Sequence, residues 1–208
     1  MARAQAERTT RPRDSQATKE LLLAAATAEF AEHGLAGARI DRIGERAGVN
    51  KRLLYVYFGD KQQLFDVVLE RQLEQLVAAV PFDATDLPGF AAARFDYMLA
   101  NPETARLVNW RIFDRAVPAE WERRGFKARV DAVAAAQREG KLRSDIRAID
   151  MYAIVLRMSE SWLGAPPALK DAAGKNPLSP KRVNEHRDAL LGAVRSVAEA
   201  GKKPQQAA

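Results

Sequence analysis

Apolar residues recur at helical spacing from near the start of the chain. Within residues 18–33, Leu22, Ala26 and Phe30 are spaced four residues apart, which places them on one face of a helix. Gly34 follows directly and suits the left-handed position at which helices commonly end. The pattern therefore predicts a first helix over 18–33.

Two short helices and one long helix are predicted next. Apolar residues at positions i, i+3 and i+7 predict a helix over 40–47, and a second short helix is predicted over 51–58. Asp60 and Gln63 have the spacing of a capping box, in which each side chain binds the backbone N–H of the other residue. The long helix therefore begins after Asp60 and ends before Pro81.

The remainder of the chain also has helical periodicity. Further helices are predicted over 88–100, from Asn101-Pro102-Glu103 through Phe113, from Pro118 to about Gly140, from Asp145 to Leu163, and from Ser179-Pro180 onward. The stretch 164–180, rich in Pro, Gly and Lys, is expected to form a loop. Because no stretch alternates apolar and polar residues as a strand does, the sequence predicts an all-α fold.

Composition excludes several classes of protein. Of the 208 residues, 47% are apolar and 29% are charged, as in ordinary globular proteins, and none is Cys. Without Cys there is no disulfide framework, thiol nucleophile or Cys-ligated metal. The longest strongly apolar run, 21–28, is too short to span a bilayer. We therefore expect a soluble cytoplasmic protein with no membrane segment.

The distribution of charge is more informative than the total of +6. Residues 1–19 and 39–61 each carry three net positive charges, and the segment between them carries three net negative charges. Two basic segments around an acidic supporting helix are compatible with a polyanionic partner. Charge alone leaves ordinary solvated surface as an equally good explanation.

The junction between the two short helices predicts a helix-turn-helix. Ala47, Gly48 and Val49 supply in order a small residue at the helix crossing, a residue that tolerates positive φ, and an apolar residue for the core. Asn50 is then a good N-cap. Lys51 and Arg52 come next, although cations at a helix N-terminus oppose the helix dipole. A bound phosphate would reverse that effect, so their position favours a nucleic-acid surface.

The run 40–64 resembles the DNA-binding domain of TetR-family transcriptional regulators. It contains A-G-V at 47–49, L-Y-x-Y-F at 54–58 and D-K-x-x-L at 60–64, and the similarity extends over about residues 18–70. The resemblance implies a homodimer that binds a double-stranded DNA operator, usually as a repressor, and is released by a small-molecule effector.

The resemblance also implies which residues contact DNA. The candidates are Arg39, Asn50, Lys51, Arg52, Leu53, Tyr55, Tyr57 and Lys61. The sequence departs from the family in two places: Ala38-Arg39 stands where Thr or Ser usually precedes the second helix, and Gly44 stands where Ala is usual. A hydroxyl cap is therefore missing, and the second helix is expected to be weakened slightly. Whether the N-terminal arm reaches a minor groove is left open.

The resemblance also implies a domain order. We expect a mobile basic arm over 1–17, a three-helix helix-turn-helix domain over 18–62, a larger helical effector-binding and dimerisation domain over 63–201, and a frayed tail over 202–208. Candidate pocket residues are Phe95, Trp110, Phe113, Tyr152, Ser159 and Trp162. The wide apolar surfaces of the helices predicted over 146–163 and 183–198 suggest that they pair with the same helices of a second copy.

Enzymatic function is not supported by the sequence. The two histidines, His33 and His186, lie on different predicted helices, and there is no G-x-S-x-G, P-loop or metal-spaced cluster. No metal or cofactor is expected. The alternatives are a helical ligand-binding or adaptor protein with a vestigial helix-turn-helix, suggested by Ala38-Arg39 and Gly44, and a transcriptional activator of the same fold.

Overall fold

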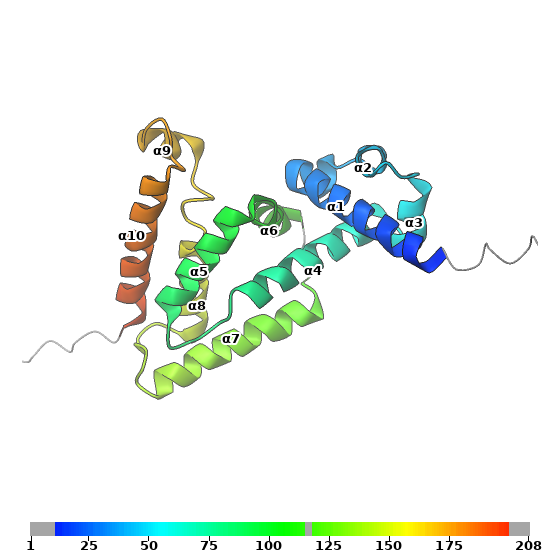
Figure 1. Cartoon of the computed structure of the whole chain (residues 1–208). Helices are drawn as coiled ribbons and strands as arrows, with labels where there is room; N and C mark the ends of the chain where they lie inside the picture. Colours follow the sequence, from blue (N-terminus) through cyan, green and yellow to red (C-terminus); the bar gives the residue numbers. More distant parts are fainter. Residues whose placement is uncertain (1–10, 115–117, 200–208) are drawn as a thin grey trace, which may run out of the picture. The chain divides into compact units, whose positions relative to one another are not determined.

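The computed structural model describes the backbone of residues 11–114 and 118–199 and the side chains of residues 15–111 and 118–199. In these ranges the backbone forms ten α-helices and no β-strand, so the all-α prediction is confirmed (Figure 1). None of the described helices is both long enough and apolar enough to cross a membrane.

The helices form two compact units. The first contains α1 (Arg11–Gly37), α2 (Ile40–Ala47), α3 (Arg52–Phe58), α4 (Lys61–Ala79) as far as Gln75, and α6 (Pro102–Asp114). The second contains the end of α4, α5 (Leu87–Ala100), α7 (Glu120–Arg138), α8 (Ala148–Met158), α9 (Pro167–Ala172) and α10 (Pro180–Ala198). This division differs from the predicted boundary at 62/63, because α4 continues unbroken past that point and α6 packs on α1.

The first unit is built on one apolar core. The predicted stripe of α1 is buried, and the Phe30 ring meets the Phe65 ring of α4 edge to face, with centroids 5.1 Å apart. Ile43 of α2 and Leu54 of α3 are buried in the same core. Leu107 of α6 completes it. Each of the two short helices therefore contributes a buried apolar anchor, and further apolar residues of both helices pack partly against the same core.

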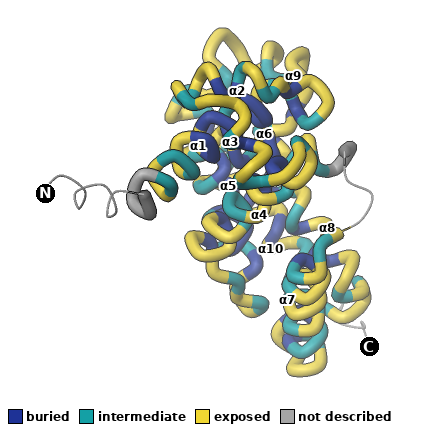
Figure 2. The backbone as a smooth tube through the Cα atoms, turned by 90° about the vertical axis from the view of Figure 1, so that its right-hand side faces the viewer, coloured by how far each residue is buried: buried dark blue, intermediate teal, exposed yellow. Residues whose placement is uncertain are grey.

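The second unit packs α5 against α8 and α10, and α7 against α8. Its buried apolar residues include Phe95, Met98, Met151, Val155, Leu190 and Val194. Among them lies a buried ion pair between Arg94 and Glu160, with 2.6 Å between Arg94 Nη2 and Glu160 Oε1. Helix α7 is only partly covered: exposed and half-buried residues make up most of it, and Glu122, Val133 and Ala136 are buried, as the mixed colours of this helix in Figure 2 show.

The structure corrects the predicted ends of several helices. Helix α1 begins at Arg11, seven residues before the predicted start, and Gly34 (φ 65°, ψ −179°) interrupts it three residues before its end. The side chains of residues 15–17 are half-buried or exposed, so this turn has no buried apolar residue from which the sequence could predict it. Helix α7 begins at Glu120 because the Glu122 carboxylate accepts the Ala119 N–H, at 2.9 Å.

The region after Met158 also differs from the prediction. Helix α8 ends there instead of at Leu163, and the hydroxyls of Ser159 and Ser161 donate to carbonyl oxygens three residues earlier. The stretch expected as a loop contains α9, which begins at Pro167, where the missing N–H of proline costs no helical hydrogen bond. Local hydrogen bonds outside the apolar pattern therefore set these boundaries.

Candidate nucleic-acid interface

The turn between α2 and α3 has the geometry that the sequence predicted. Gly48 is left-handed (φ 65°, ψ 27°), and its N–H donates to the Glu45 carbonyl oxygen at 3.1 Å. Val49 is half-buried against the core of the first unit. Asn50 Oδ1 accepts the Arg52 N–H at 2.9 Å, so this side chain caps the start of α3 as predicted. The turn thus sets the direction of α3 on the core.

Gly44 gives this turn the space that it needs. A Cβ at this position would lie 3.1 Å from the Val49 carbonyl oxygen and 3.3 Å from Lys51 Cβ. The Val49 N–H donates to the Gly44 carbonyl oxygen at 3.0 Å, which holds the two segments at that separation. The departure from the family's usual Ala therefore has a structural reason in the close approach of α2 to the start of α3.

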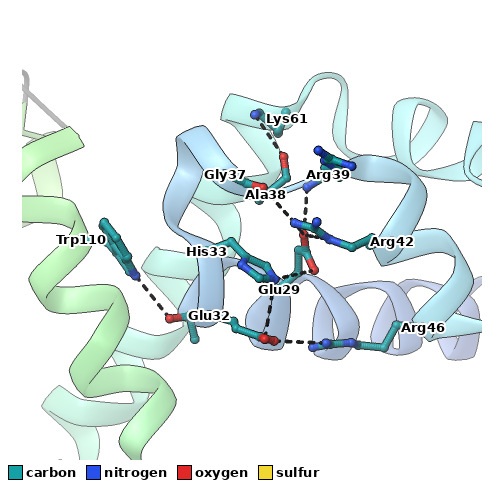
Figure 3. A network of polar contacts seen from close by, with 11 residues as sticks. Glu29, Glu32, His33, Gly37, Ala38, Arg39, Arg42, Arg46, Lys61 and Trp110 are labelled. Carbon is teal, nitrogen blue, oxygen red and sulfur yellow. Dashed lines mark hydrogen bonds and ion pairs between the residues drawn. The ribbon is translucent and has the colours of Figure 1, made fainter.

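Glu29 of α1 replaces the missing cap of α2. The N-terminus of α2 has no hydrogen bond from the side chain of its own N-cap residue, Arg39. Instead Glu29 Oε1 accepts the Arg39 N–H at 2.9 Å and Arg42 Nε–H at 2.7 Å (Figure 3). Arg42 Nη2 also donates to the Gly37 carbonyl oxygen at 2.8 Å. The carboxylate thereby connects α1 to the first turn of α2.

The electrostatics of Glu29 favour its charged form although the residue is fully buried. Burial on its own would raise the pKa of this carboxyl group. The hydrogen bonds from Arg42 and from the Arg39 backbone outweigh that effect and lower the pKa below its usual value. Sequence reasoning missed this role, although one signal was available: Glu29 lies on the same helical face as Leu22, Ala26 and Phe30.

The outward side of α3 carries two cations and two apolar side chains. Lys51 and Arg52 at its start are both exposed. Lys51 Nζ lies 2.6 Å from Asp41 Oδ1 of α2, and this hydrogen bond raises the pKa of Lys51. Tyr55 is 55% exposed and Val56 is 72% exposed. Val56 was absent from the predicted contacts, although helical spacing places it on the side of the helix that faces away from Leu54 and Phe58.

Two predicted contact residues of α3 are partly engaged in packing. Leu53 and Tyr57 are half-buried against the core of the first unit. The Lys19 ammonium lies over the Tyr57 ring, 5.1 Å from its centroid. Each of these residues therefore presents only part of its side chain to the surface.

The last two predicted contacts flank the loop between α1 and α2. The Arg39 side chain is exposed and forms no ion pair within the described residues, whereas its N–H is held by Glu29. Lys61 Nζ donates to the carbonyl oxygens of Ala38, at 3.3 Å, and Ala36, at 3.5 Å (Figure 3). An open hollow beside Lys61 is lined by Leu35, Ala36, Asp60, Lys61 and Gln62.

The first turn of α4 is fixed by the predicted capping box. Asp60 Oδ1 accepts the Gln63 N–H at 2.8 Å, and Gln63 Oε1 accepts the Asp60 N–H at 3.0 Å.

One predicted pocket residue belongs to the first unit. Trp110 of α6 donates its indole N–H to the Ala31 carbonyl oxygen of α1 at 3.3 Å (Figure 3). Its ring covers Gly34 so closely that a Cβ there would lie 2.9 Å from Trp110 Cδ2. The side chain of Phe113, another predicted pocket residue, lies outside the described residues.

The other predicted pocket residues form two groups in the second unit. Tyr152 is surrounded by three rings at centroid distances of 5.5, 6.3 and 6.2 Å; we call Phe82, Phe90, Phe126 and Tyr152 the Tyr152 cluster. Phe95 and Trp162 both contact the His186 ring, at 5.4 Å each. Ser159 is buried, and its hydroxyl donates to the Leu156 carbonyl oxygen at 2.6 Å.

The arrangement in the first unit defines the class of protein. A short helix is set on the core by a left-handed turn, begins with two exposed cations, and follows a helix whose N-terminus is tied back to α1. This is a helix-turn-helix of the kind that DNA-binding proteins place in the major groove, with the second helix leading.

Comparison with known proteins identifies the family. Residues 22–68 match the model described as "Bacterial regulatory proteins, tetR family", and residues 86–196 match the model described as "Tetracyclin repressor-like, C-terminal domain". The chain belongs to the TetR family and is a DNA-binding transcriptional regulator.

Individual relatives agree with that assignment. The chain is 41% identical over 162 residues to the HTH-type transcriptional repressor SCO4008 of Streptomyces coelicolor, covering 76% of this chain and 84% of that one. It is 41% identical over 69 residues to the HTH-type transcriptional activator FasR of Mycolicibacterium smegmatis, covering 33% and 31% of the two chains. A solved structure of the transcriptional regulator SCO4942 of S. coelicolor superposes with a TM-score of 0.77 at 34% identity, covering 87% of this chain and 98% of that one.

Proposed function

We propose that the chain is a homodimeric repressor that binds a palindromic operator through α3 and leaves it when a small molecule binds to the C-terminal domain. The similarity to a relative named as a transcriptional repressor, over three quarters of this chain, supports the direction of regulation.

The exposed side of α3 carries the proposal. Leu54 anchors this helix in the core. Val56 is 72% exposed and Tyr55 is 55% exposed, so the helix has an apolar surface that the rest of the chain does not cover. The Val56 methyl groups suit contact with a thymine methyl group in the major groove. Arg52, at the first turn, has the length and the paired donors to bind a guanine edge.

Phosphate contacts are assigned to residues around α3. The exposed Arg39 and the Lys61 ammonium flank the loop before α2 and the start of α4. Lys51, although it binds Asp41, keeps further N–H donors for a phosphate oxygen. Together these cations would fix the orientation of the protein on the duplex without reading its sequence.

A second copy of the chain is expected on the second unit. Four of its large apolar side chains, Ile149, Ile154, Leu169 and Leu178, are between 41% and 55% exposed. The exposure of these large side chains in the single chain is consistent with a surface that another protein covers. A dimer with two-fold symmetry would read two half-sites about 34–36 Å apart.

The test begins by selecting the operator from genomic fragments with the purified full chain. Its affinity is then measured by fluorescence anisotropy between about 50 and 200 mM salt. We expect the double variant Lys51→Ala/Lys61→Ala to bind more weakly and to lower the salt slope by about 2, because each lost phosphate contact removes about 0.9 from that slope. The matched control is Lys127→Ala, which removes an exposed lysine paired with Asp131 on α7 and is expected to leave the slope unchanged.

Equal affinity and equal salt slope for the double variant and the wild type would refute the assignment of these contacts. Asp41→Asn tests the same contact in the opposite direction, because it releases Lys51 from its ion pair and removes a negative charge beside it. That variant is expected to bind the operator more tightly at low salt. Selection of no specific sequence, together with tight binding of a small molecule, would favour the adaptor alternative instead.

Activation is the second candidate function. The observation in its favour is the similarity to FasR, a relative named as a transcriptional activator. Transcription in vitro from a promoter that carries the selected operator at its natural position separates the two: a repressor lowers the yield of transcript and an activator raises it.

A further inference from the structure

The Tyr152 cluster is an aromatic site with one open edge. Tyr152 is buried among the three other rings, whereas Phe126 of α7 is 39% exposed. Phe82 meets Tyr152 edge to face with centroids 5.5 Å apart, and Phe90 stacks on Tyr152 at an interplanar angle of 28°. A flat apolar ligand can therefore extend an existing set of ring contacts at the Phe126 edge.

A buried guanidinium near this cluster has an unused donor. Arg94 of α5 is 8% exposed and binds Glu160 through Nη2. Its Nε is fully shielded from solvent and has no hydrogen-bond acceptor among the described residues. A buried charged donor without an acceptor is costly, and such groups in native proteins usually have a functional reason.

A second guanidinium points to the same ligand chemistry. Arg129 of α7 is half-buried, and its charge lowers the pKa of the Tyr152 phenol, but no carboxylate in the described part of the chain lies within ion-pair distance of it. Glu160 is already shared, because its two carboxylate oxygens accept from Arg94 at 2.6 Å and from Arg157 at 2.5 Å. The surroundings of the Tyr152 phenol therefore carry a surplus of positive charge.

Helical spacing places both cations beside the rings of the cluster. Arg94 follows Phe90 by four residues on α5, and Arg129 follows Phe126 by three residues on α7, so each lies on the same helical face as a ring that contacts Tyr152. Burial raises the pKa of the Tyr152 phenol, and the nearby charges of Arg129 and Arg94 offset part of that rise. The phenol therefore stays protonated at neutral pH, and two guanidinium groups lie near the aromatic cluster.

We infer that the Tyr152 cluster with Arg94 and Arg129 binds an aromatic anion, whose ring packs on the exposed edge of the cluster at Phe126 and whose acidic group accepts hydrogen bonds from the two guanidinium groups. This inference rests on the proposed function, because it names the chemical class of the effector. It adds two residues, Arg94 and Arg129, that the predicted pocket lacked.

The test compares two fluorescent probes with the same ring system. The anionic probe is 8-anilinonaphthalene-1-sulfonate and the neutral probe is N-phenyl-1-naphthylamine, each titrated into the full-length protein. We expect saturable binding with at least tenfold preference for the anion. Arg94→Lys keeps a cation that pairs with Glu160 but lacks Nε, and Arg129→Gln keeps a hydrogen-bonding group without the charge. Each is expected to weaken the anionic probe about tenfold and to change the neutral probe less than twofold.

Arg187→Lys is the matched control. Arg187 binds Asp96 through Nε at 2.9 Å on the exposed side of α10, so the substitution repeats the chemical change of Arg94→Lys at another ion pair of the same unit. It is expected to leave both probes unaffected. Circular dichroism checks that each variant is folded, and Arg129→Gln keeps the test decisive if Arg94→Lys does not fold. An anionic probe bound no more tightly than the neutral one, or bound equally by both variants and the wild type, would overturn the inference.

Operator binding is measured separately so that the two proposals can fail independently. Without probe, both variants are expected to bind the operator as the wild type does, and saturating anionic probe is expected to weaken operator binding by the wild type alone. Anion-selective binding that leaves operator affinity unchanged would overturn the effector role. Wild-type protein that binds no operator would refute the proposed function while the probe titrations still decide whether the aromatic anion binds here.

Discussion

Glu29 offers the sharpest test of how the DNA-binding unit is held together. The carboxylate is fully buried and joins α1 to α2 through the Arg39 N–H and the Arg42 guanidinium. Glu29→Gln keeps the shape and one acceptor oxygen but removes the charge. Glu29→Ala removes the acceptor altogether, which leaves the Arg39 N–H without its partner.

The expected magnitudes follow from these contacts. A hydrogen bond to a charged group contributes about 1.5–3 kcal/mol, and the partial exposure of Arg42 reduces that contribution through solvent screening. We therefore expect Glu29→Gln to lower the free energy of unfolding by about 1–2 kcal/mol. Glu29→Ala is expected to cost about 3 kcal/mol, because it also leaves a buried donor unsatisfied and a small cavity.

The assay is urea unfolding followed by circular dichroism at a fixed protein concentration, since the proposed dimer would couple stability to concentration. The pKa of Glu29 lies below its unfolded value of 4.5, so its contribution is present above pH 4.5 and is lost as the pH falls through the folded pKa. The difference between wild type and Glu29→Gln should therefore shrink below pH 4.5. Glu32→Gln, which breaks an exposed pair with Arg46, serves as the control and should cost at most about 0.5 kcal/mol. Identical urea midpoints and m-values for wild type and Glu29→Gln would refute this reasoning.

Three further substitutions test other parts of the molecule. Gly44→Ala should change the free energy of unfolding by less than about 1 kcal/mol, because the higher helix propensity of Ala offsets the close contact of its Cβ with Val49 and Lys51. The same variant should bind the operator more weakly in the anisotropy assay, because the new Cβ displaces Lys51. Gly34→Ala should lower the free energy of unfolding measured in urea by about 2–3 kcal/mol, because φ is 65° at this residue and Trp110 occupies the space of the new Cβ. In a double-mutant cycle, the added substitution Trp110→Leu should restore part of that loss. Burial and the charge of Arg182 lower the pKa of His186 below 6.5, so wild-type stability should fall as the pH drops below 6.5, and thermal melts of His186→Asn should show a smaller fall.

Local patterns account for the parts of the interface that sequence predicted. The left-handed Gly48, the Asn50 cap and the Asp60–Gln63 capping box each depend on residues within three positions of one another. The apolar anchors Ile43 and Leu54 follow from helical periodicity. These features were readable because their geometry is set by short stretches of chain.

The parts that sequence did not predict depend on residues far apart in the chain. Glu29 accepts the N–H of Arg39, ten residues later, at the start of α2, and Lys61 donates to a carbonyl oxygen 23 residues earlier. Trp110 was predicted to line a pocket, yet its indole N–H donates to Ala31, 79 residues away. Helical periodicity marks which side of a helix is apolar but not which neighbour covers it, so these pairings required the tertiary structure.

The start of α3 shows how stability and function differ at this site. Lys51 and Arg52 stand at a helix N-terminus, where cations cost about 0.3–1 kcal/mol each at an exposed position. Asp41 offsets the charge of Lys51 at 2.6 Å, but both side chains are exposed, so solvent screens the pair and it adds little to stability. A DNA phosphate at the same place would complement both the lysine and the free N–H groups of the helix. If this end of α3 meets a DNA phosphate as proposed, an arrangement that is close to neutral in the free protein would become favourable on DNA, because only an exposed ion pair would have to be exchanged.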